Sequence, residues 1–337
     1  MLTVVVNNFR ETERVVRCLR SVKASRGVET EIIVVDCQTP GLRERITPEF
    51  PDVRLISLDS DPGPSAQRKL GYDAAGTDSE VVVFLDNDCT VDPTCLATLA
   101  RIFVDEPKMG LVQPVILSSS EASVEGSGGY LDPLFFATRQ RLPTGGANAA
   151  SSPVLVSYSD SAVCAIRRGV LNAYPAELTS FDPDYFLFFE DVDLSIRMWL
   201  AGYLVAVAPG AIAYNEWRVT RGHATLSPER VRLNERNRLK TLLRVYSRAN
   251  LVKYLPLALV FDVSKALAVL RSHPKHARAS LGAIFDVVLQ AHDIAQRRRI
   301  IQRTRRLPDA AFLSHFVPLS VETLLTNYRF HYARPGT

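Results

Sequence analysis

The first half of the chain alternates between short apolar runs and segments with helical spacing. The runs at 2–6, 31–35 and 81–85 consist mostly of aliphatic residues, which is typical of strands that are buried on both faces of a sheet. Between the first two runs, residues 11–25 place their apolar side chains at helical intervals. This alternation predicts an α/β fold with a Rossmann-like, mostly parallel sheet and helices on both faces.

The same pattern continues beyond these elements. It predicts a strand at 53–58, a helix at 65–75 capped by Ser65, a helix at 94–104, a strand at 110–117 and a strand at 154–166. Residues 118–152 are rich in Ser, Gly and Ala and show little periodicity. A stretch of this length is more often a functional loop than part of a core. We therefore expect a mobile flap at 118–152.

The pattern changes after about residue 225. Residues 229–248 are helical and basic, and residues 251–270 form an apolar helix interrupted by Lys253, Asp262 and Lys265. Charges are costly in the middle of a bilayer, so a helix lying in the membrane interface is favoured over one that spans it. Together with the apolar segment 281–289, this predicts a basic, partly amphipathic helical region at 226–337.

Charge separates the two regions more clearly than the total of +4 suggests. Residues 1–214 carry 18 Lys and Arg against 28 Asp and Glu, a net of −10, while residues 215–337 carry 22 against 8, a net of +14. A basic tail indicates contact with an anionic membrane surface. The alternative is a helical subdomain that packs on itself or on a partner in a homo-oligomer. Nucleic acid is not expected, because no recognition module accompanies the cations.

The five cysteines are odd in number and scattered, with no C-x-x-C pair. This pattern is typical of reduced cytosolic thiols and argues against a disulfide framework or a zinc site.

The run 81–85 ends in a candidate for chemistry, the sequence Asp86-Asn87-Asp88. Ligands of open α/β sheets bind at the carboxyl ends of the strands, and paired carboxylates there are suited to a divalent cation such as Mg²⁺ or Mn²⁺. Taken alone, such a pair is more often an acidic turn, here before Pro93.

Two motifs carry a resemblance to a known family. The first comprises Gly63, Arg68 and Gly71 followed by Asp86-Asn87-Asp88, and the second is the run 188–194, Phe-Phe-Glu-Asp-Val-Asp-Leu. Their order and their separation of about 100 residues resemble family 2 glycosyltransferases of the GT-A fold, especially rhamnosyltransferase-like members, over roughly residues 1–250. The chain departs from the family at Lys69, where an Asn is usual, and at its opening Val-Val-Val-Asn-Asn.

The resemblance implies roles for individual residues. As catalytic groups it implies Asp191, the general base, and Glu190, which orients the base or the acceptor. For the nucleotide-sugar donor it implies Asn8, Asp36, Arg68, Asp86 and Asn87. For the metal it implies Asp88 and Asp86, with either Asn215 or His223 as a further ligand, because the family's usual His falls at Asn215. For the acceptor it implies Asp160, Trp217 and Asp193, of which Asp193 is also a candidate support of its helix.

These roles imply a catalytic domain at 1–225, with a nucleotide-sugar-binding half at 1–117 and an acceptor-binding half at 118–225. The expected reaction is inverting transfer of a sugar, such as rhamnose or another deoxysugar, from a dTDP, UDP or GDP donor to a hydroxyl of a glycan, glycolipid or polyprenyl-linked acceptor. The expected location is cytoplasmic, on the inner face of the plasma membrane. The alternatives are a nucleotidyltransferase and a non-catalytic protein that binds nucleotide sugars.

Overall fold

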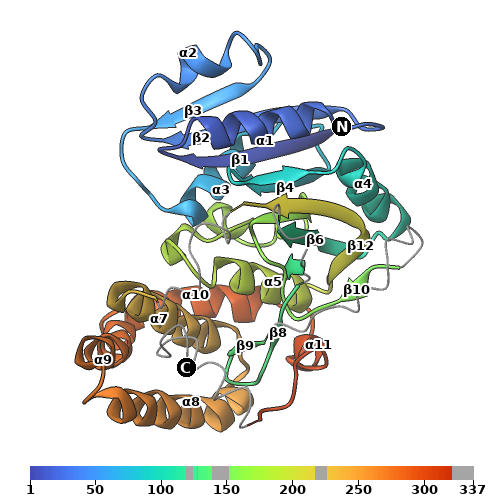
Figure 1. The fold of residues 1–337 in the computed structure, drawn as a ribbon. Coiled ribbons are helices and arrows are strands. Elements are labelled where there is room, and N and C mark those ends of the chain that lie inside the picture. Colours follow the sequence, from blue (N-terminus) through green and yellow to red (C-terminus); the bar gives the residue numbers. More distant parts are fainter. Residues whose placement is uncertain (119–123, 127, 139–151, 217–225, 321–337) are drawn as a thin grey trace.

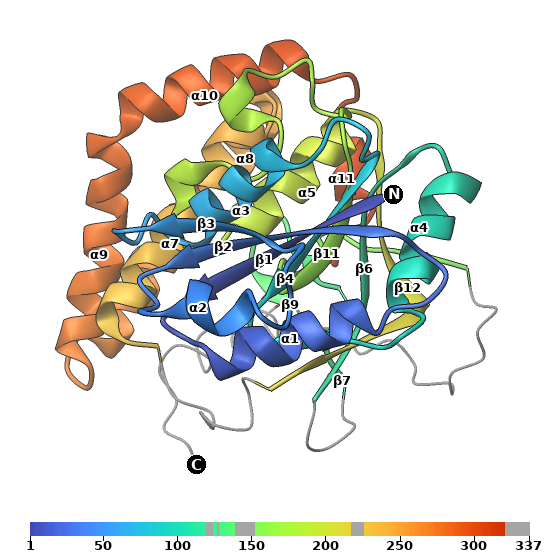
Figure 2. The same cartoon turned by 90° about the horizontal axis from the view of Figure 1, so that it is seen from above.

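The fold is built on one mixed sheet with helices on both faces (Figures 1 and 2). The structure, a computed structural model, describes residues 1–118, 124–126, 128–138, 152–216 and 226–320. Within these ranges the sheet has the strand order β10-β12-β6-β11-β4-β1-β2-β3, with β5 beside β12 and β7 beside β6. Its strands are β1 (Leu2–Phe9), β2 (Thr30–Cys37), β3 (Arg54–Leu58), β4 (Val81–Asp86), β5 (Cys89–Val91), β6 (Met109–Ser118), β7 (Val124–Gly126), β10 (Val154–Leu155), β11 (Val163–Arg167) and β12 (Leu204–Asn215). The predicted α/β class is confirmed.

The strands β3, β2, β1 and β4 pair in parallel. β1, β2 and β4 are buried on both faces, while the edge strand β3 is partly exposed. Along β1, for example, Val4 and Val6 pack into one core while Val5 packs into the other. This double burial explains the continuous apolar runs in the sequence. β1 is longer than predicted, because Asn7 and Asn8 still pair with neighbouring strands although their side chains are polar.

Helices cover the two faces of the sheet (Figure 2). One face carries α1 (Glu13–Lys23), α2 (Leu42–Ile46) and α4 (Cys95–Asp105). The other carries α3 (Pro64–Ala74) and α5 (Glu190–Leu200). The sequence pattern did not predict α2, because five residues are too few to establish a helical period.

The start of α3 differs from the prediction. Gly63, with φ of 85°, precedes the helix, and Pro64 occupies its first turn, which is a favourable position for proline. Ser65 lies inside the helix, and its hydroxyl donates to the main-chain oxygen of Asp182 at 2.7 Å. Ser65 is therefore not the cap, and it links α3 to a segment 117 residues further along the chain.

Gly71 allows α3 to approach β1 closely. A Cβ at this position would lie 2.1 Å from Val5 Cγ1, and Val5 is held between the sheet and the helix with no exposed surface.

We expect Gly71→Ala to lower the free energy of unfolding by about 1–3 kcal/mol, which is the usual effect of overpacking a core. The higher helix propensity of alanine, about 1 kcal/mol over glycine, acts in the opposite direction. Urea denaturation measures this change. Leu70→Ala, at an exposed position of the same helix, is the matched control. A more stable Gly71→Ala protein would show that helix propensity outweighs the contact.

The second half of the sheet contains an unpredicted reversal of direction. β11 is antiparallel to both of its neighbours, β4 and β6, while β12 runs parallel to β6. The predicted strand at 154–166 is in fact two strands, β10 and β11. The apolar pattern alone does not distinguish these arrangements, because a strand buried on both faces has the same composition in either direction.

Residues 118–152 contain more structure than their composition indicates. The described part includes β7 and a small hairpin of β8 (Tyr130–Leu131) and β9 (Ala137–Thr138). Leu131 and Phe135 in this hairpin are fully buried. The expectation of an irregular flap is therefore wrong for 128–138, while residues 119–123, 127 and 139–151 lie outside the described ranges.

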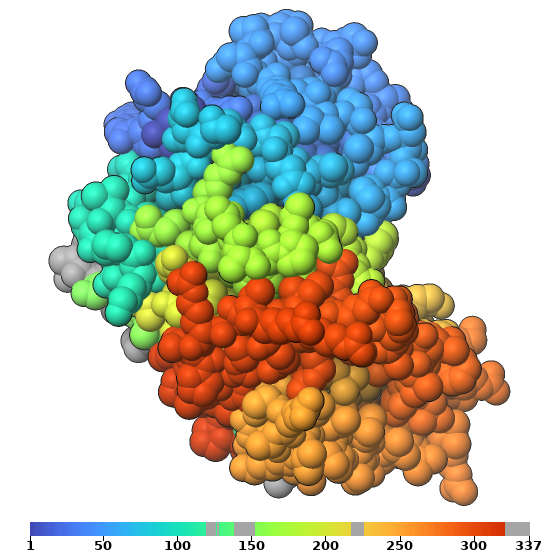
Figure 3. All heavy atoms as spheres, turned by 180° about the vertical axis from the view of Figure 1, so that it is seen from behind, coloured from blue at the N-terminus to red at the C-terminus, as the bar shows by residue number. Residues whose placement is uncertain are grey.

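The C-terminal region continues as helices below the sheet (Figure 1). They are α7 (Pro228–Val245), α8 (Arg248–Val269), α9 (Pro274–Leu289), α10 (Ala291–Thr304) and α11 (Ala310–Leu313). Leu239, Tyr246 and Phe312 share one continuous core with residues of the sheet and of α5. From behind, the helices and the central segment form one surface (Figure 3). The helical extension is thus confirmed, while the boundary at 225 stays a prediction.

Two buried ion pairs join α8 to α7. Arg238 pairs with Asp262, and Lys265 pairs with Glu235. All four side chains are almost completely buried. In the described part of the chain, no helix is both long enough and apolar enough to cross a membrane.

All five cysteines are free and buried. Burial raises the pKa of each thiol, so they are poor nucleophiles.

Candidate functional site

Three residues that the sequence analysis assigned to the nucleotide-sugar donor lie together at the carboxyl ends of β1, β2 and β4. Asn8 donates through Nδ2 to Asp36 Oδ1 at 2.7 Å, and Asn87 donates through Nδ2 to Asn8 Oδ1 at 2.6 Å. Thr39, which was not predicted, donates through its hydroxyl to Asp36 Oδ1 at 2.6 Å. These bonds fix the carboxylate of Asp36 and the two amides at the edge of the sheet where open α/β proteins bind ligands.

Arg68 connects this edge to the second acidic motif. It projects from α3 and is only 2% exposed. Its Nη2 donates to Asp86 Oδ1 at 2.7 Å and its Nη1 donates to Glu190 Oε1 at 3.1 Å. Burial alone would lower the pKa of Arg68, but the charges of Asp86 and Glu190 raise it above its ordinary value. The guanidinium therefore stays charged and joins two motifs that lie about 100 residues apart.

Both carboxylates that contact Arg68 have raised pKa values. Burial is the main cause for each, and the arginine offsets only part of it. The pKa of Asp86 is raised to about 6. Glu190 Oε2 is buried and has no hydrogen-bond partner among the described residues. The site thus carries more negative charge than Arg68 neutralises.

Asp191 lies beside Glu190 in the first turn of α5 and is partly exposed. Its Oδ1 accepts from the main-chain N–H of Val192 at 2.8 Å. The pKa of Asp191 is raised well above its usual range. Burial is the main cause, and the negative charges of Glu190 and Asp160 add to it. A partly exposed carboxyl with a raised pKa is suited to accept a proton from a bound hydroxyl.

Asp160 approaches the same site from the opposite side of the sheet edge. Its Oδ1 accepts from the N–H of Ala162 at 2.9 Å, and its own N–H donates to Gln113 Oε1 at 2.6 Å. The N–H of Asp86 in turn donates to the oxygen of Ala162 at 2.9 Å. The turn that precedes β11 is therefore bonded directly to the end of β4.

The position of Asp193 differs from the one that an acceptor-binding role would require. It is 1% exposed. Its Oδ2 accepts from Arg197 Nε at 2.7 Å and its Oδ1 accepts from the hydroxyl of Tyr185 at 3.2 Å. The structure thus places Asp193 inside the protein, where it supports α5 and does not face the acceptor.

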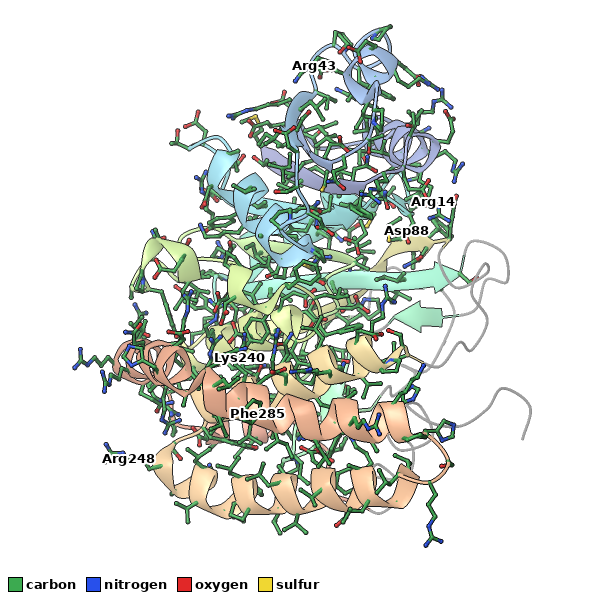
Figure 4. The ribbon with its side chains drawn as sticks, turned by 90° about the vertical axis from the view of Figure 1, so that its left-hand side faces the viewer. Arg14, Arg43, Asp88, Lys240, Arg248 and Phe285 are labelled. Carbon is green, nitrogen blue, oxygen red and sulfur yellow. The ribbon has the colours of Figure 1, made fainter. Side chains whose placement is uncertain are left out.

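The possible metal ligands lie at the outer part of this edge. Asp88 is partly exposed, and Arg14 lies near it (Figure 4). Burial is the main cause of the raised pKa of Asp88, and Arg14 opposes it. The main-chain oxygen of Asp88 accepts from the N–H of Glu216 at 3.0 Å. Asn215, in β12, is paired with Cys89, in β5. Asn215 is therefore close to Asp88 in the fold.

No third acidic or histidine ligand joins this pair in the described ranges, where no cluster of three or more His, Cys, Asp or Glu side chains is arranged to hold a metal ion. Two predicted residues, Trp217 and His223, lie outside the described residues.

The loop that leads into α5 has an unusual backbone. Phe186, Phe188 and Phe189 all have φ between 61° and 68°, a region that costs non-glycine residues of order 1–3 kcal/mol each. Asn237, on α7, places its Nδ2 at 2.9 Å from the main-chain oxygens of Tyr185, Leu187 and Phe188. We did not predict this contact.

Cations of α7 hold the start of the same segment. Lys240 donates to the main-chain oxygen of Asp184 at 2.8 Å and to its carboxylate at 2.9 Å. Arg244 pairs with Asp182 at 3.1 Å and also with Asp184. The helical region therefore fixes both ends of the segment that positions Glu190 and Asp191.

Comparison with known proteins agrees with this arrangement. A family model described as "Glycosyltransferase like family 2" matches residues 1–240. The succinoglycan biosynthesis protein ExoO of Rhizobium meliloti (strain 1021) is 35% identical over 94 residues. That match spans 27% of this chain and 26% of ExoO.

Two solved structures are similar in fold. The crystal structure of GalNAc-T7 with UDP, GalNAc and Mn²⁺ has a TM-score of 0.60 and 16% identity, over 89% of this chain and 58% of that one. The crystal structure of residues 1–349 of S. aureus TarS with UDP-GlcNAc has a TM-score of 0.54 and 16% identity, over 99% and 93% of the two chains. At these identities the likeness establishes a common fold.

Proposed function

The chain belongs to glycosyltransferase family 2, and we propose that it transfers a sugar from a nucleoside-diphosphate donor to a hydroxyl acceptor with inversion at the anomeric carbon. The observation that carries this proposal is the link made by Arg68. It joins Asp86, at the donor edge, to Glu190, which adjoins the candidate base Asp191. One rigid unit thus contains a place for the leaving group and a place for proton removal.

The donor side of the proposal rests on Asn8, Asp36 and Asn87. Their bonded amides and carboxylate present donors and acceptors of the kind that recognise a base and a ribose. Solved structures of similar fold were crystallised with UDP or UDP-GlcNAc, so we take a UDP sugar as the first candidate. The dTDP and GDP sugars, including dTDP-rhamnose, are the next candidates.

The side chains of Asp88 and Asp86 offer the type of ligand atom that a hard divalent cation prefers. Their carboxylate oxygens, with the amide oxygen of Asn215 as a neighbour, are ligands that Mg²⁺ and Mn²⁺ prefer. When bound, such a cation stabilises the charge that develops on the diphosphate. Structural support for a cation in this fold comes from GalNAc-T7, which was crystallised with Mn²⁺.

Asp191 would act as the general base. The acceptor oxygen attacks the anomeric carbon and forms the new C–O bond while its proton passes to the Asp191 carboxylate. The bond from that carbon to the diphosphate oxygen breaks on the opposite face, which inverts the configuration. Glu190 keeps Arg68 and the first turn of α5 in place.

The acceptor is proposed more broadly, as a hydroxyl of a glycan, glycolipid or polyprenyl-linked sugar. The name of ExoO connects that relative to succinoglycan, a polysaccharide. Asp160 lies beside Asp191 and is the described residue best placed to contact the acceptor.

Two alternatives make different predictions. A nucleotidyltransferase of similar sheet topology would release pyrophosphate. A non-catalytic binding protein would need no base, yet Asp191 has the exposure and raised pKa of one.

The test is a panel of UDP, dTDP, GDP and CMP sugars in a thermal-shift assay, with Mn²⁺ and then with EDTA. We expect one donor class to raise Tm, and EDTA to remove most of the increase. The matching nucleoside diphosphate should be released when an acceptor is added. If no donor gives metal-dependent stabilisation, the donor site is overturned. Release of pyrophosphate from a nucleoside triphosphate and a sugar 1-phosphate, tested in a separate assay, would favour a nucleotidyltransferase.

A further inference from the structure

The outer face of α8 is apolar and exposed. Val252, Val260 and Leu267 are 77%, 65% and 60% exposed, and Leu257, Val263 and Leu270 are also exposed. α9 packs against α8 and adds Leu281, Phe285, Val288 and Leu289, of which Phe285 is 60% exposed. Ten large apolar side chains that are exposed on two packed helices favour a contact surface. We call these ten residues the apolar face.

The polarity of α8 is reversed relative to an ordinary surface helix. Its charged residues Asp262 and Lys265 point inward, where they pair with Arg238 and Glu235 on α7. Five of its valines and leucines, Val252, Leu257, Val260, Val263 and Leu267, are instead exposed on the outer side. Because the buried pairs fix the rotation of α8, the apolar face cannot turn into the core without leaving four charges unpaired. Unpaired buried charges are strongly destabilising.

The exposed charges on the two described helices α8 and α9, and on the turn between them, are all positive. The exposed ionised residues of α8, α9 and the turn between them are Arg248, Lys253, Arg271, Lys275 and Arg278. The acidic residues of the two helices are Asp262, which is buried, and Asp286, which is half-buried and bonded twice to Arg232 at 2.7 and 2.6 Å. Apolar side chains with a rim of cations suit the interface of an anionic bilayer.

We propose that the apolar face docks on the surface of an anionic lipid bilayer, with the five cations contacting headgroups and the aliphatic and Phe285 side chains entering the acyl boundary. A second copy of the chain fits less well. A twofold contact places the same patch of each copy against the other, which would bring cations toward cations. This inference does not depend on the proposed reaction.

The position of α8 in the molecule is compatible with docking. Arg248, on α8, lies at the opposite end of the molecule from Arg43, on α2, and Asp88 lies between them (Figure 4). A bilayer in contact with α8 therefore leaves the candidate site uncovered.

The test is flotation of the full chain with vesicles of phosphatidylcholine alone or mixed with phosphatidylglycerol, at low and high salt. We expect flotation with the anionic vesicles and its loss at high salt. The double variant Val260→Glu/Leu267→Glu should lower the partition coefficient between vesicles and water by more than about tenfold. Each change replaces an apolar side chain that would pass from water into the bilayer. Arg248→Glu should lower it by at least about fivefold, the usual contribution of one cation at an anionic surface.

Two matched variants serve as controls. Val104→Glu replaces a valine on α4 that is 76% exposed, and Arg43→Glu reverses an exposed cation at the other end of the molecule. Both should float like the unmodified chain. The proposal is overturned if the chain fails to float with anionic vesicles, or if the control variants lose as much binding as the test variants. It is also overturned if the chain is a dimer without vesicles and Val260→Glu with Leu267→Glu makes it a monomer.

Discussion

Asp191→Asn is expected to lower kcat for sugar transfer by at least about 100-fold, because general bases contribute about 10²–10⁴-fold. The amide has the size of the carboxylate and keeps an oxygen to accept from Val192. However, it cannot take the acceptor proton. Donor binding should persist, since Asn8, Asp36 and Arg68 do not use Asp191. Steady-state kinetics and the donor-induced rise in Tm measure the two effects separately.

Asp105→Asn, at an exposed position in the last turn of α4, is the control and should retain full activity. Turnover near the unmodified rate by Asp191→Asn would remove Asp191 from the role of base. Loss of donor binding together with turnover would instead indicate that the first turn of α5 had been displaced.

The pH dependence of kcat follows from the same residue. A base acts only when deprotonated, so kcat should fall as the pH drops through the pKa of Asp191. Because that pKa is raised, the fall should occur above the pH range of an ordinary carboxyl group, about 4. Asp160→Asn removes one of the negative charges that raise the pKa, so it should move the fall to lower pH. An unchanged profile would show that another group titrates.

Asn237→Asp is the second change for which we expect a large effect. The side chain keeps its size, but a carboxylate replaces the amide N–H groups that contact three main-chain oxygens. Repulsion between these oxygens should release the loop with its left-handed phenylalanines. Displacement of a catalytic group by about 1 Å costs about 100-fold in rate. We therefore expect kcat to fall by about that factor while KM for the donor changes little.

Asn234→Asp makes the same chemical change one turn earlier on α7, where the side chain is only half-buried. It should leave kcat unchanged. Circular dichroism and Tm distinguish a positioning effect from unfolding. A parallel loss of kcat and donor affinity in Asn237→Asp would argue that Asn237 stabilises the whole fold and does not position α5 in particular.

The sequence predicted most of the sheet, because its central strands are buried on both sides. The runs in β1, β2 and β4 are apolar without interruption, and such runs are recognisable without knowledge of neighbours. The direction of β11 was not recognisable. It depends on the path of the chain through residues 152–162, where no local pattern specifies the partner strand.

The site was predictable to the extent that its residues follow strand ends. Asp36 and Asp86 lie at the carboxyl ends of β2 and β4, the two strands that flank β1, so their position at one edge of the sheet follows from its parallel arrangement. Two roles stayed open for Asp193, acceptor binding and support of its helix, because an acidic residue in the first turn of a helix has the same sequence signature whether it faces solvent or a buried arginine. Asn237 was missed because its acceptors are backbone oxygens, which leave no mark on the sequence of the loop they belong to.

The contacts of Asn237, Lys240 and Arg244 with residues 182–188 have a consequence for recombination among relatives. A crossover near residue 226 would combine the loop of one parent with the α7 of another. Such a chimera would inherit a loop whose strained backbone depends on side chains encoded elsewhere. Exchanges that alter acceptor choice should therefore succeed when α7 is transferred together with α5, as a single inherited block.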